Sequence, residues 1–114
     1  MSNEEIIKKA KELGKALKES EEYKELIEAQ KALDEDEETQ KLLNDYNTKA
    51  QEIQLKQMTG ENINDNMVEL QKLEQDIMNS ETMKRYTEAE DKFKKLIEST
   101  NQAIVESMEE EQKE

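Results

Sequence analysis

Four lysine side chains form the only concentrated positive surface that the sequence predicts. They recur at intervals of three and four residues, which places them on one face of a helix: Lys8, Lys11, Lys15 and Lys18. The chain as a whole is acidic, with 30 acidic against 17 basic side chains and a net charge of −13. A solvated helix face is the ordinary interpretation of such a pattern. The functional interpretation is a docking surface for an acidic partner protein.

Five adjacent carboxylates at residues 34–38 are the sharpest candidate for a metal site. The run lacks the alternating ligand spacing and the turn glycine of a calcium-binding loop. A helix junction explains it more simply, because Asp34 or Asp36 is a good N-cap and the glutamates suit the first turn of a helix. We therefore expect no metal site and no cofactor.

Catalytic chemistry has few candidates in this sequence, which contains no Cys and no His. Their absence excludes thiolate metal sites, ligation of iron–sulfur clusters by Cys, Cys or His nucleophiles and His general bases. The serines lack a His partner, and two glycines cannot build a loop that cradles a phosphate. The many carboxylates fall on solvent faces without an apolar pocket to raise a pKa. We expect that the protein is not an enzyme.

The charge balance and the hydropathy limit the partners further. A net charge of −13 disfavours direct binding to nucleic acid or to anionic lipid. No apolar run reaches the roughly 20 residues that a membrane span needs, and no signal-peptide core is present. The sequence predicts a cytoplasmic protein whose partners are other proteins.

Two long helices are expected to carry most of the structure, at residues 36–58 and 82–108. The first presents an apolar stripe of Thr39, Leu43, Tyr46, Ala50, Ile53 and Gln57. The second presents a wider face of Met83, Tyr86, Ala89, Phe93, Leu96, Ile97, Thr100, Ala103, Ile104 and Met108. Their similar lengths predict that they pair with each other as antiparallel helices.

Three shorter helices complete the expected set. Their apolar faces are Ile6, Ala10, Leu13 and Leu17, then Tyr23, Leu26, Ile27, Gln30 and Leu33, and then Met67, Leu70, Leu73 and Ile77. Ser2 or Asn3, Ser20, and Asn79 or Ser80 stand where caps are needed, and Gly60 can close the long helix. Gly14 lies beside the first stripe, either for close helix approach or as a tolerated surface glycine.

The fold class that follows is all-α, an elongated bundle of about five helices in one domain over residues 1–114. The acidic tail at residues 109–114 has nothing to bury and should fray. Only 32% of the residues are apolar and 41% are charged. So few apolar residues can form only a small hydrophobic core within one chain. This predicts self-association, as a homodimer or a higher oligomer.

Three segments resemble the YlbF/YmcA family of small helical bacterial proteins. Residues 13–23, Leu-Gly-Lys-Ala-Leu-Lys-Glu-Ser-Glu-Glu-Tyr, resemble its N-terminal signature. Residues 56–63, Lys-Gln-Met-Thr-Gly-Glu-Asn-Ile, resemble the turn of its YheA-like branch. Ala89-Glu90 followed by Phe93 is similar to the start of the family's last helix. The likeness extends over most of the chain, about residues 6–108.

This resemblance implies an all-helical, self-associating, non-enzymatic regulator. YlbF and YmcA act with YaaT in a complex that influences competence, sporulation and biofilm formation and assists RNase Y in mRNA maturation. That complex is associated with iron–sulfur clusters held by Cys. Cluster binding is not carried over to this sequence, because it has no Cys. The YheA-like branch implies no particular activity.

The functional prediction is a regulatory or adaptor protein that acts through protein–protein interaction, linked to RNA processing or developmental regulation. The alternative is a holdase-like helical chaperone subunit that shields unfolded clients. A holdase should expose apolar residues at its helix tips. The tips of this sequence are polar and acidic apart from Leu55, Met58 and Ile63, which favours the adaptor.

Overall fold

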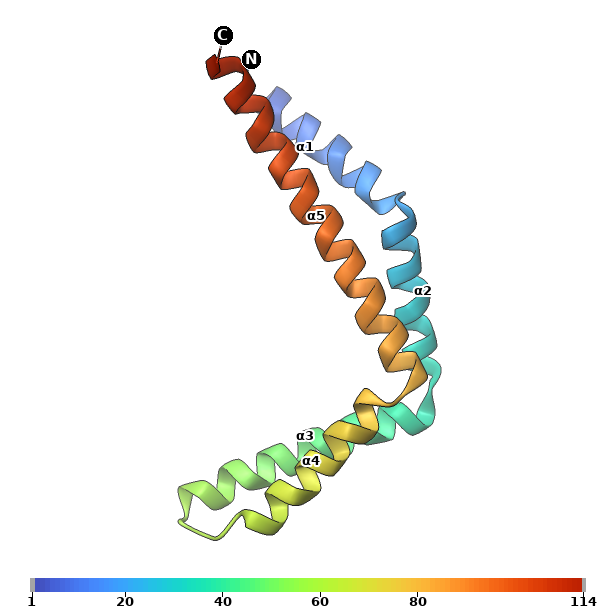
Figure 1. The fold of residues 1–114 in the computed structure, drawn as a ribbon, viewed down its shortest axis with the longest axis vertical. Coiled ribbons are helices and arrows are strands. Elements are labelled where there is room, and N and C mark those ends of the chain that lie inside the picture. The colour runs from blue at the N-terminus through green and yellow to red at the C-terminus, as the bar shows by residue number, and fades with distance from the viewer. Residues whose placement is uncertain (1, 114) are drawn as a thin grey trace. The chain divides into compact units, whose positions relative to one another are not determined.

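The structure is a computed structural model that describes residues 2–113, with the side chains of residues 2–110. These residues form five helices, coloured along the chain in Figure 1, and contain no strand. The helices are α1 (Asn3–Lys18), α2 (Glu21–Glu35), α3 (Glu37–Met58), α4 (Asn64–Met78) and α5 (Glu81–Lys113). The predicted all-α fold with five helices is confirmed, and both long helices lie where they were expected.

Polar side chains begin four of the helices where the sequence places caps. Ser2 and Ser20 accept hydrogen bonds from the backbone N–H groups three residues further on, at 3.3 and 3.1 Å. Asp36 does the same for α3 at 3.1 Å and Ser80 for α5 at 3.3 Å. Each cap satisfies an N–H group that has no partner inside its helix. After α3 the chain turns at Gly60, whose φ of +75° lies in the left-handed region that glycine adopts without strain.

The contacts of the chain divide it into two compact units. One contains Met1–Glu28 and Thr87–Glu114, and the other contains Ala29–Tyr86. That the chain folds as a single domain stays a prediction. The backbone of residues 109–113 continues α5, and residue 114 of the acidic tail lies outside the described residues. That this tail frays also stays a prediction.

In the unit Ala29–Tyr86, α3 and α4 run side by side and are joined by the turn at Gly60 (Figure 1). Ile53 of α3 is 6% exposed and forms part of the small core of this unit. The expected pairing of the two long helices is therefore wrong, because the extended packing partner of α3 is α4. A short turn makes consecutive helices antiparallel neighbours, and this connectivity outweighs the matched lengths of α3 and α5.

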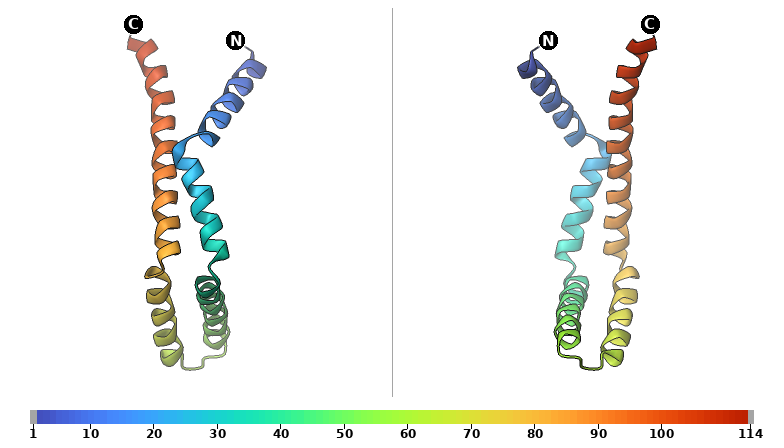
Figure 2. Two further views of the ribbon diagram at one scale, coloured as in Figure 1. Left: turned by 90° about the vertical axis from the view of Figure 1, so that its right-hand side faces the viewer. Right: turned by 90° about the vertical axis from the view of Figure 1, so that its left-hand side faces the viewer.

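In the other unit, α5 contacts the first turn of α2. The rings of Tyr23 and Phe93 meet edge to face, with centroids 5.4 Å apart and an interplanar angle of 61°. Ala89 of α5 is 2% exposed, whereas α1 contains no buried residue. Figure 2 shows that α1 and the C-terminal part of α5 diverge from each other.

Candidate partner-docking site

The four lysines predicted as a docking face all lie on α1. Lys8, Lys11, Lys15 and Lys18 are exposed. Within the described part of the chain, no ion pair or hydrogen bond involves any of their ammonium groups. The structure therefore brings them together as one solvent-exposed positive face.

Lysines of α3 behave differently, because nearby carboxylates hold them. Lys49 Nζ lies 2.6 Å from Glu69 of α4 and 3.1 Å from Glu52 of its own helix. Hydrogen bonds to Glu69 and then to Glu52 raise the pKa of Lys49. Hydrogen bonds from Lys49 and Lys56 in turn lower the pKa of the Glu52 carboxyl. These cations serve the packing of α3 on α4 and are not available to a partner.

The opposite side of α1 departs from the sequence expectation. Its stripe was expected to pack as one face, yet only Leu17 is half-buried, and Ile6, Ala10 and Leu13 are exposed. Apart from its two chain neighbours and the backbone of α1, nothing lies within 4 Å of the point that a Cβ on Gly14 would occupy. Within one chain, Gly14 is thus a surface glycine rather than a point of close helix approach.

The acidic run at residues 34–38 forms the helix junction that the sequence favours. Asp36 caps α3, and its Oδ2 accepts hydrogen bonds from the hydroxyls of Thr39 at 2.8 Å and Thr82 at 2.7 Å. The hydroxyl oxygens of Thr39 and Ser80 lie 2.7 Å apart. The cluster joins the start of α3 to the start of α5. Among residues 2–113, no group of three or more acidic side chains is placed to hold a metal ion.

The sequence predicted a cap at Asp34 or Asp36 and another at Asn79 or Ser80. It did not predict that two threonine hydroxyls link Asp36 to Ser80. The signal was present, because each cap is followed by a threonine, Thr39 and Thr82, on the first turn of its helix. The hydrogen bonds from Thr82 and then from Thr39 hold the pKa of the Asp36 carboxyl below its usual range. The Asp36 carboxylate accepts hydrogen bonds from two hydroxyls, and its lowered pKa makes it a weak base, so the geometry supports a structural role.

Acid should weaken this junction. Because the folded state depresses the pKa of Asp36, its contribution is present above the unfolded pKa of about 3.9 and is lost as the pH falls through the folded value. We expect Asp36→Asn to lower the denaturation midpoint at pH 7 and to lose less stability than wild type between pH 7 and pH 3. Asp34→Asn removes the same charge from an exposed neighbour and should keep the wild-type pH dependence. Equal pH dependence in wild type and Asp36→Asn would show that the cluster contributes nothing.

The sequence of this chain matches one known protein family over most of its length. The family described as control of competence regulator ComK, YlbF/YmcA, matches residues 6–109, which include the whole lysine face. The chain belongs to the YlbF/YmcA family. The resemblance predicted from the three segments is confirmed. The description is of a regulator and names no enzyme.

UPF0342 proteins of Staphylococcus aureus are among the proteins that this chain resembles. Those of strains JH9, Newman and COL are each 34% identical over 102 residues, covering 89% of this chain and 90% of the relative. No solved structure matches the chain. Between residues 2 and 113, no helix is both long and apolar enough to cross a membrane.

Proposed function

We propose that this YlbF/YmcA protein is a non-enzymatic cytoplasmic adaptor that docks to an acidic partner protein through the lysine face of α1. The observation that carries the proposal is the exposed set of four lysines without ion-pair partners. The family description supports a regulatory role. Developmental regulation or RNA processing is the setting that the family resemblance implies.

Charge selects a protein partner over a nucleic acid for this face. A phosphate backbone would meet four lysines but also the field of a chain whose net charge is −13. An acidic patch on a folded protein is smaller than a phosphate backbone, so it can contact α1 without approaching the acidic rest of the chain. Exposed charges of this kind act mainly on the association rate and on specificity, and their effect weakens as salt is added.

Reversal of the lysine face tests the proposal. Changing Lys8, Lys11, Lys15 and Lys18 to Glu should reduce recovery of the partner in an affinity pull-down by about tenfold or more. The matched control reverses four exposed lysines elsewhere, Lys24, Lys31, Lys72 and Lys94, and takes the net charge from −13 to −21 in the same way, since each reversal subtracts two. The control should retain the partner.

Circular dichroism and light scattering on both variants separate lost docking from a lost fold or a changed mass. Equal recovery of the partner by the reversed variant and wild type would contradict the proposal. Tight RNA binding by the purified wild-type protein at physiological salt would also contradict it.

A holdase is the second candidate, and one observation favours it. At the tip formed by the end of α3 and the start of α4, Leu55 is 66%, Met58 78% and Val68 66% exposed. The sequence expectation did not include Val68 among the apolar tip residues. A holdase would suppress the aggregation of a heated model client, and replacing these three residues with Ser would remove the effect. The adaptor proposal predicts no suppression by the wild-type protein.

A further inference from the structure

We infer that the partner of the lysine face docks with an acidic amphipathic helix. Apolar side chains of this helix pack on Ile7 and Gly14 of α1. Its carboxylates bind Lys11 and Lys18. The inference rests on the proposed function and names the element that the partner brings to the same site.

Four exposed residues form one line along α1. Ile7, Lys11, Gly14 and Lys18 follow one another at spacings of four, three and four residues, which places them on one side of the helix. The line is roughly 16 Å long, since a helix rises about 1.5 Å per residue. Uncharged and positive positions alternate along it, so one partner segment can contact both kinds at once.

Ile7 is an exposed aliphatic side chain at the N-terminal end of this line. It is 56% exposed, and Lys11 lies one turn further on. Both residues border an open hollow on the surface of α1, which is lined by Asn3, Glu4, Ile7, Lys8 and Lys11. Covering an aliphatic side chain is favourable, so a partner that reaches Lys11 binds more tightly if it also covers Ile7.

Gly14 is a glycine that the fold of one chain does not require. It lies inside α1 without a positive φ, where glycine is less favourable than alanine. Outside its two chain neighbours and the backbone of α1, nothing packs at the point that its Cβ would occupy. The missing side chain lowers the surface of α1 between Lys11 and Lys18. A second helix can therefore approach α1 closely at Gly14.

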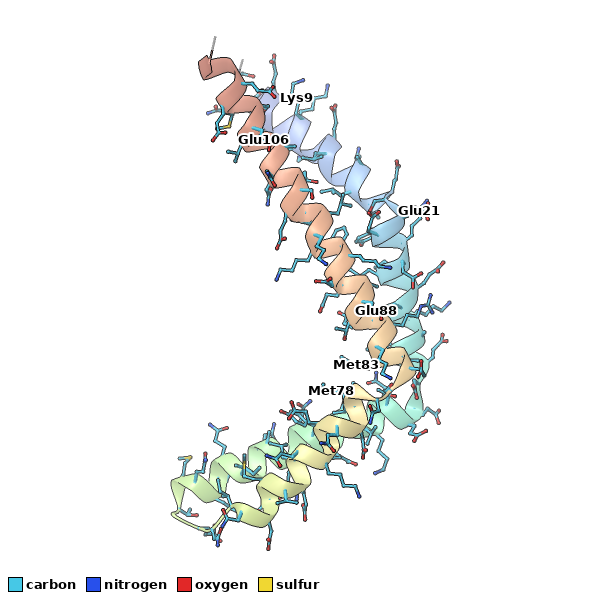
Figure 3. All side chains as sticks on the ribbon, viewed as in Figure 1. Lys9, Glu21, Met78, Met83, Glu88 and Glu106 are labelled. Carbon is cyan, nitrogen blue, oxygen red and sulfur yellow. The ribbon has the colours of Figure 1, made fainter. Side chains whose placement is uncertain are left out.

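Charge selects an acidic occupant for this line. Lys11 and Lys18 belong to the lysine face and lie one turn from Gly14 in either direction. Lys9, which is labelled in Figure 3, lies on another side of α1, because residues two apart do not share a face. A helix with carboxylates on both sides of an apolar side chain matches the line. Two copies of this chain paired through the line would instead set lysines against lysines.

The geometry favours a helix over an extended segment or a lipid surface. A helix satisfies its own backbone hydrogen bonds, whereas an extended segment finds no free backbone N–H or C=O groups along the middle of α1. A fluid lipid surface does not need the gap at Gly14, and a net charge of −13 repels anionic headgroups. Amphipathic helices bind through side chains three, four and seven positions apart, which is the spacing of this line.

Two synthetic helical peptides of equal negative charge test the inference. The leucine peptide has roughly 20 residues, long enough to be helical in water, with leucines at spacings of three and four residues between glutamates. The alanine peptide has alanine at every leucine position and the same glutamates. Fluorescence anisotropy with the full chain should show that the leucine peptide binds about tenfold or more tightly than the alanine peptide. Equal affinities, or no binding of the leucine peptide, would overturn the inference.

Ile7 and its neighbour Ile6 provide a matched pair of variants. Ile6 is 51% exposed and points to a different side of α1, since successive residues of a helix are about 100° apart. Ile7→Ala should weaken binding of the leucine peptide about tenfold, whereas Ile6→Ala should leave it within about twofold of wild type. Equal weakening by the two variants would show that the line is not the site, and would overturn the inference.

Gly14→Leu tests the close approach. A leucine fills the gap and should weaken binding of the leucine peptide about tenfold or more, although leucine is the better helix former. Ala16→Leu places the same side chain at an exposed position on the opposite side of α1 and should leave the affinity unchanged. Circular dichroism and chemical denaturation should show that the Gly14→Leu variant is at least as helical and as stable as wild type. Wild-type affinity of that variant would overturn the inference.

Other occupants of the line are outcomes of the same experiments. If light scattering shows that Ile7→Ala lowers the mass of the protein, a second copy covers the line and the inference is overturned. If the protein binds vesicles of phosphatidylglycerol and Ile7→Ala weakens that binding, a lipid surface covers the line and the inference is again overturned.

Failure of the inference is distinguishable from failure of lysine docking. If reversal of the lysine face removes the partner from the pull-down while Ile7→Ala and Gly14→Leu retain it, lysine docking stands and the inference fails. If reversal of the lysine face retains the partner, the proposed function fails as well.

Discussion

Replacing Ile53 with alanine is expected to lower the free energy of unfolding by about 2–5 kcal/mol. Ile53 is 6% exposed, on the side of α3 that packs against α4, and few other side chains of the described chain are as well buried. The change removes apolar area and leaves a cavity that two packed helices cannot easily close. The free energy of unfolding of a typical domain is about 5–15 kcal/mol, so this loss is a large part of the total stability. Chemical denaturation at one fixed protein concentration measures it.

Leu55 provides the matched control for Ile53. It lies two residues further along α3 and is 66% exposed. Leu55→Ala deletes the same number of side-chain carbons from the solvent side and should change the free energy of unfolding by about 0.5 kcal/mol or less. Equal midpoints for the two variants would show that the packing of α3 on α4 contributes little to stability.

Replacing Phe93 with alanine should lower the free energy of unfolding by about 3 kcal/mol, which is the lower end of the range for a core phenylalanine. Phe93 is the only Phe and was expected mid-stripe in the core, yet it is partly exposed within one chain. Its ring lies edge to face against Tyr23, which joins α5 to α2. Removing the ring of Phe93 deletes this contact between α5 and α2.

A double-mutant cycle isolates the aromatic contact. Phe93→Ala, Tyr23→Ala and the combined variant should show a coupling energy of about 0.5–1.5 kcal/mol. Strictly additive losses would mean that the two rings contribute independently. An unchanged midpoint for Phe93→Ala would place its side chain outside any core.

Local structure was predictable because it depends on neighbours in the sequence. The caps at Ser20, Asp36 and Ser80 and the turn at Gly60 follow from side-chain hydrogen bonding and backbone freedom. These fix where each helix begins and ends, and hence the number and the type of elements. The lysine face was predictable for the same reason, since residues three and four apart share a side of any helix.

Packing partners were not predictable in the same way. Periodicity shows which side of a helix is apolar but not which surface covers it. For helix 36–58, matched length predicted pairing with the C-terminal helix, whereas the structure packs α3 on α4, to which a short turn joins it. For Ile6 and Ile104, the same periodicity predicted a covered stripe, whereas one chain leaves both exposed.

Hydrogen bonds of buried polar side chains were the part of the fold that the sequence predicted least well. Asn66 is 8% exposed, and its amide lies between Lys56 at 3.1 Å and Glu52 at 3.4 Å. A polar residue at such a position carries no hydropathy signal, and its partners lie 10 and 14 residues away on another helix. Only the assembled pair of helices shows that its hydrogen bonds are satisfied.

Site-specific photocrosslinking from α1 tests the central claim, docking of another protein to the lysine face, most directly. A benzophenone amino acid is introduced in place of Lys15, or in place of the exposed Lys72 of α4 as the control, and cells are irradiated. The account predicts an adduct with a second, acidic protein from position 15 and none from position 72. It also predicts that the adduct disappears when Lys8, Lys11 and Lys18 are changed to Glu. Equal adducts from both positions, or no adduct with another protein from position 15, would contradict the account.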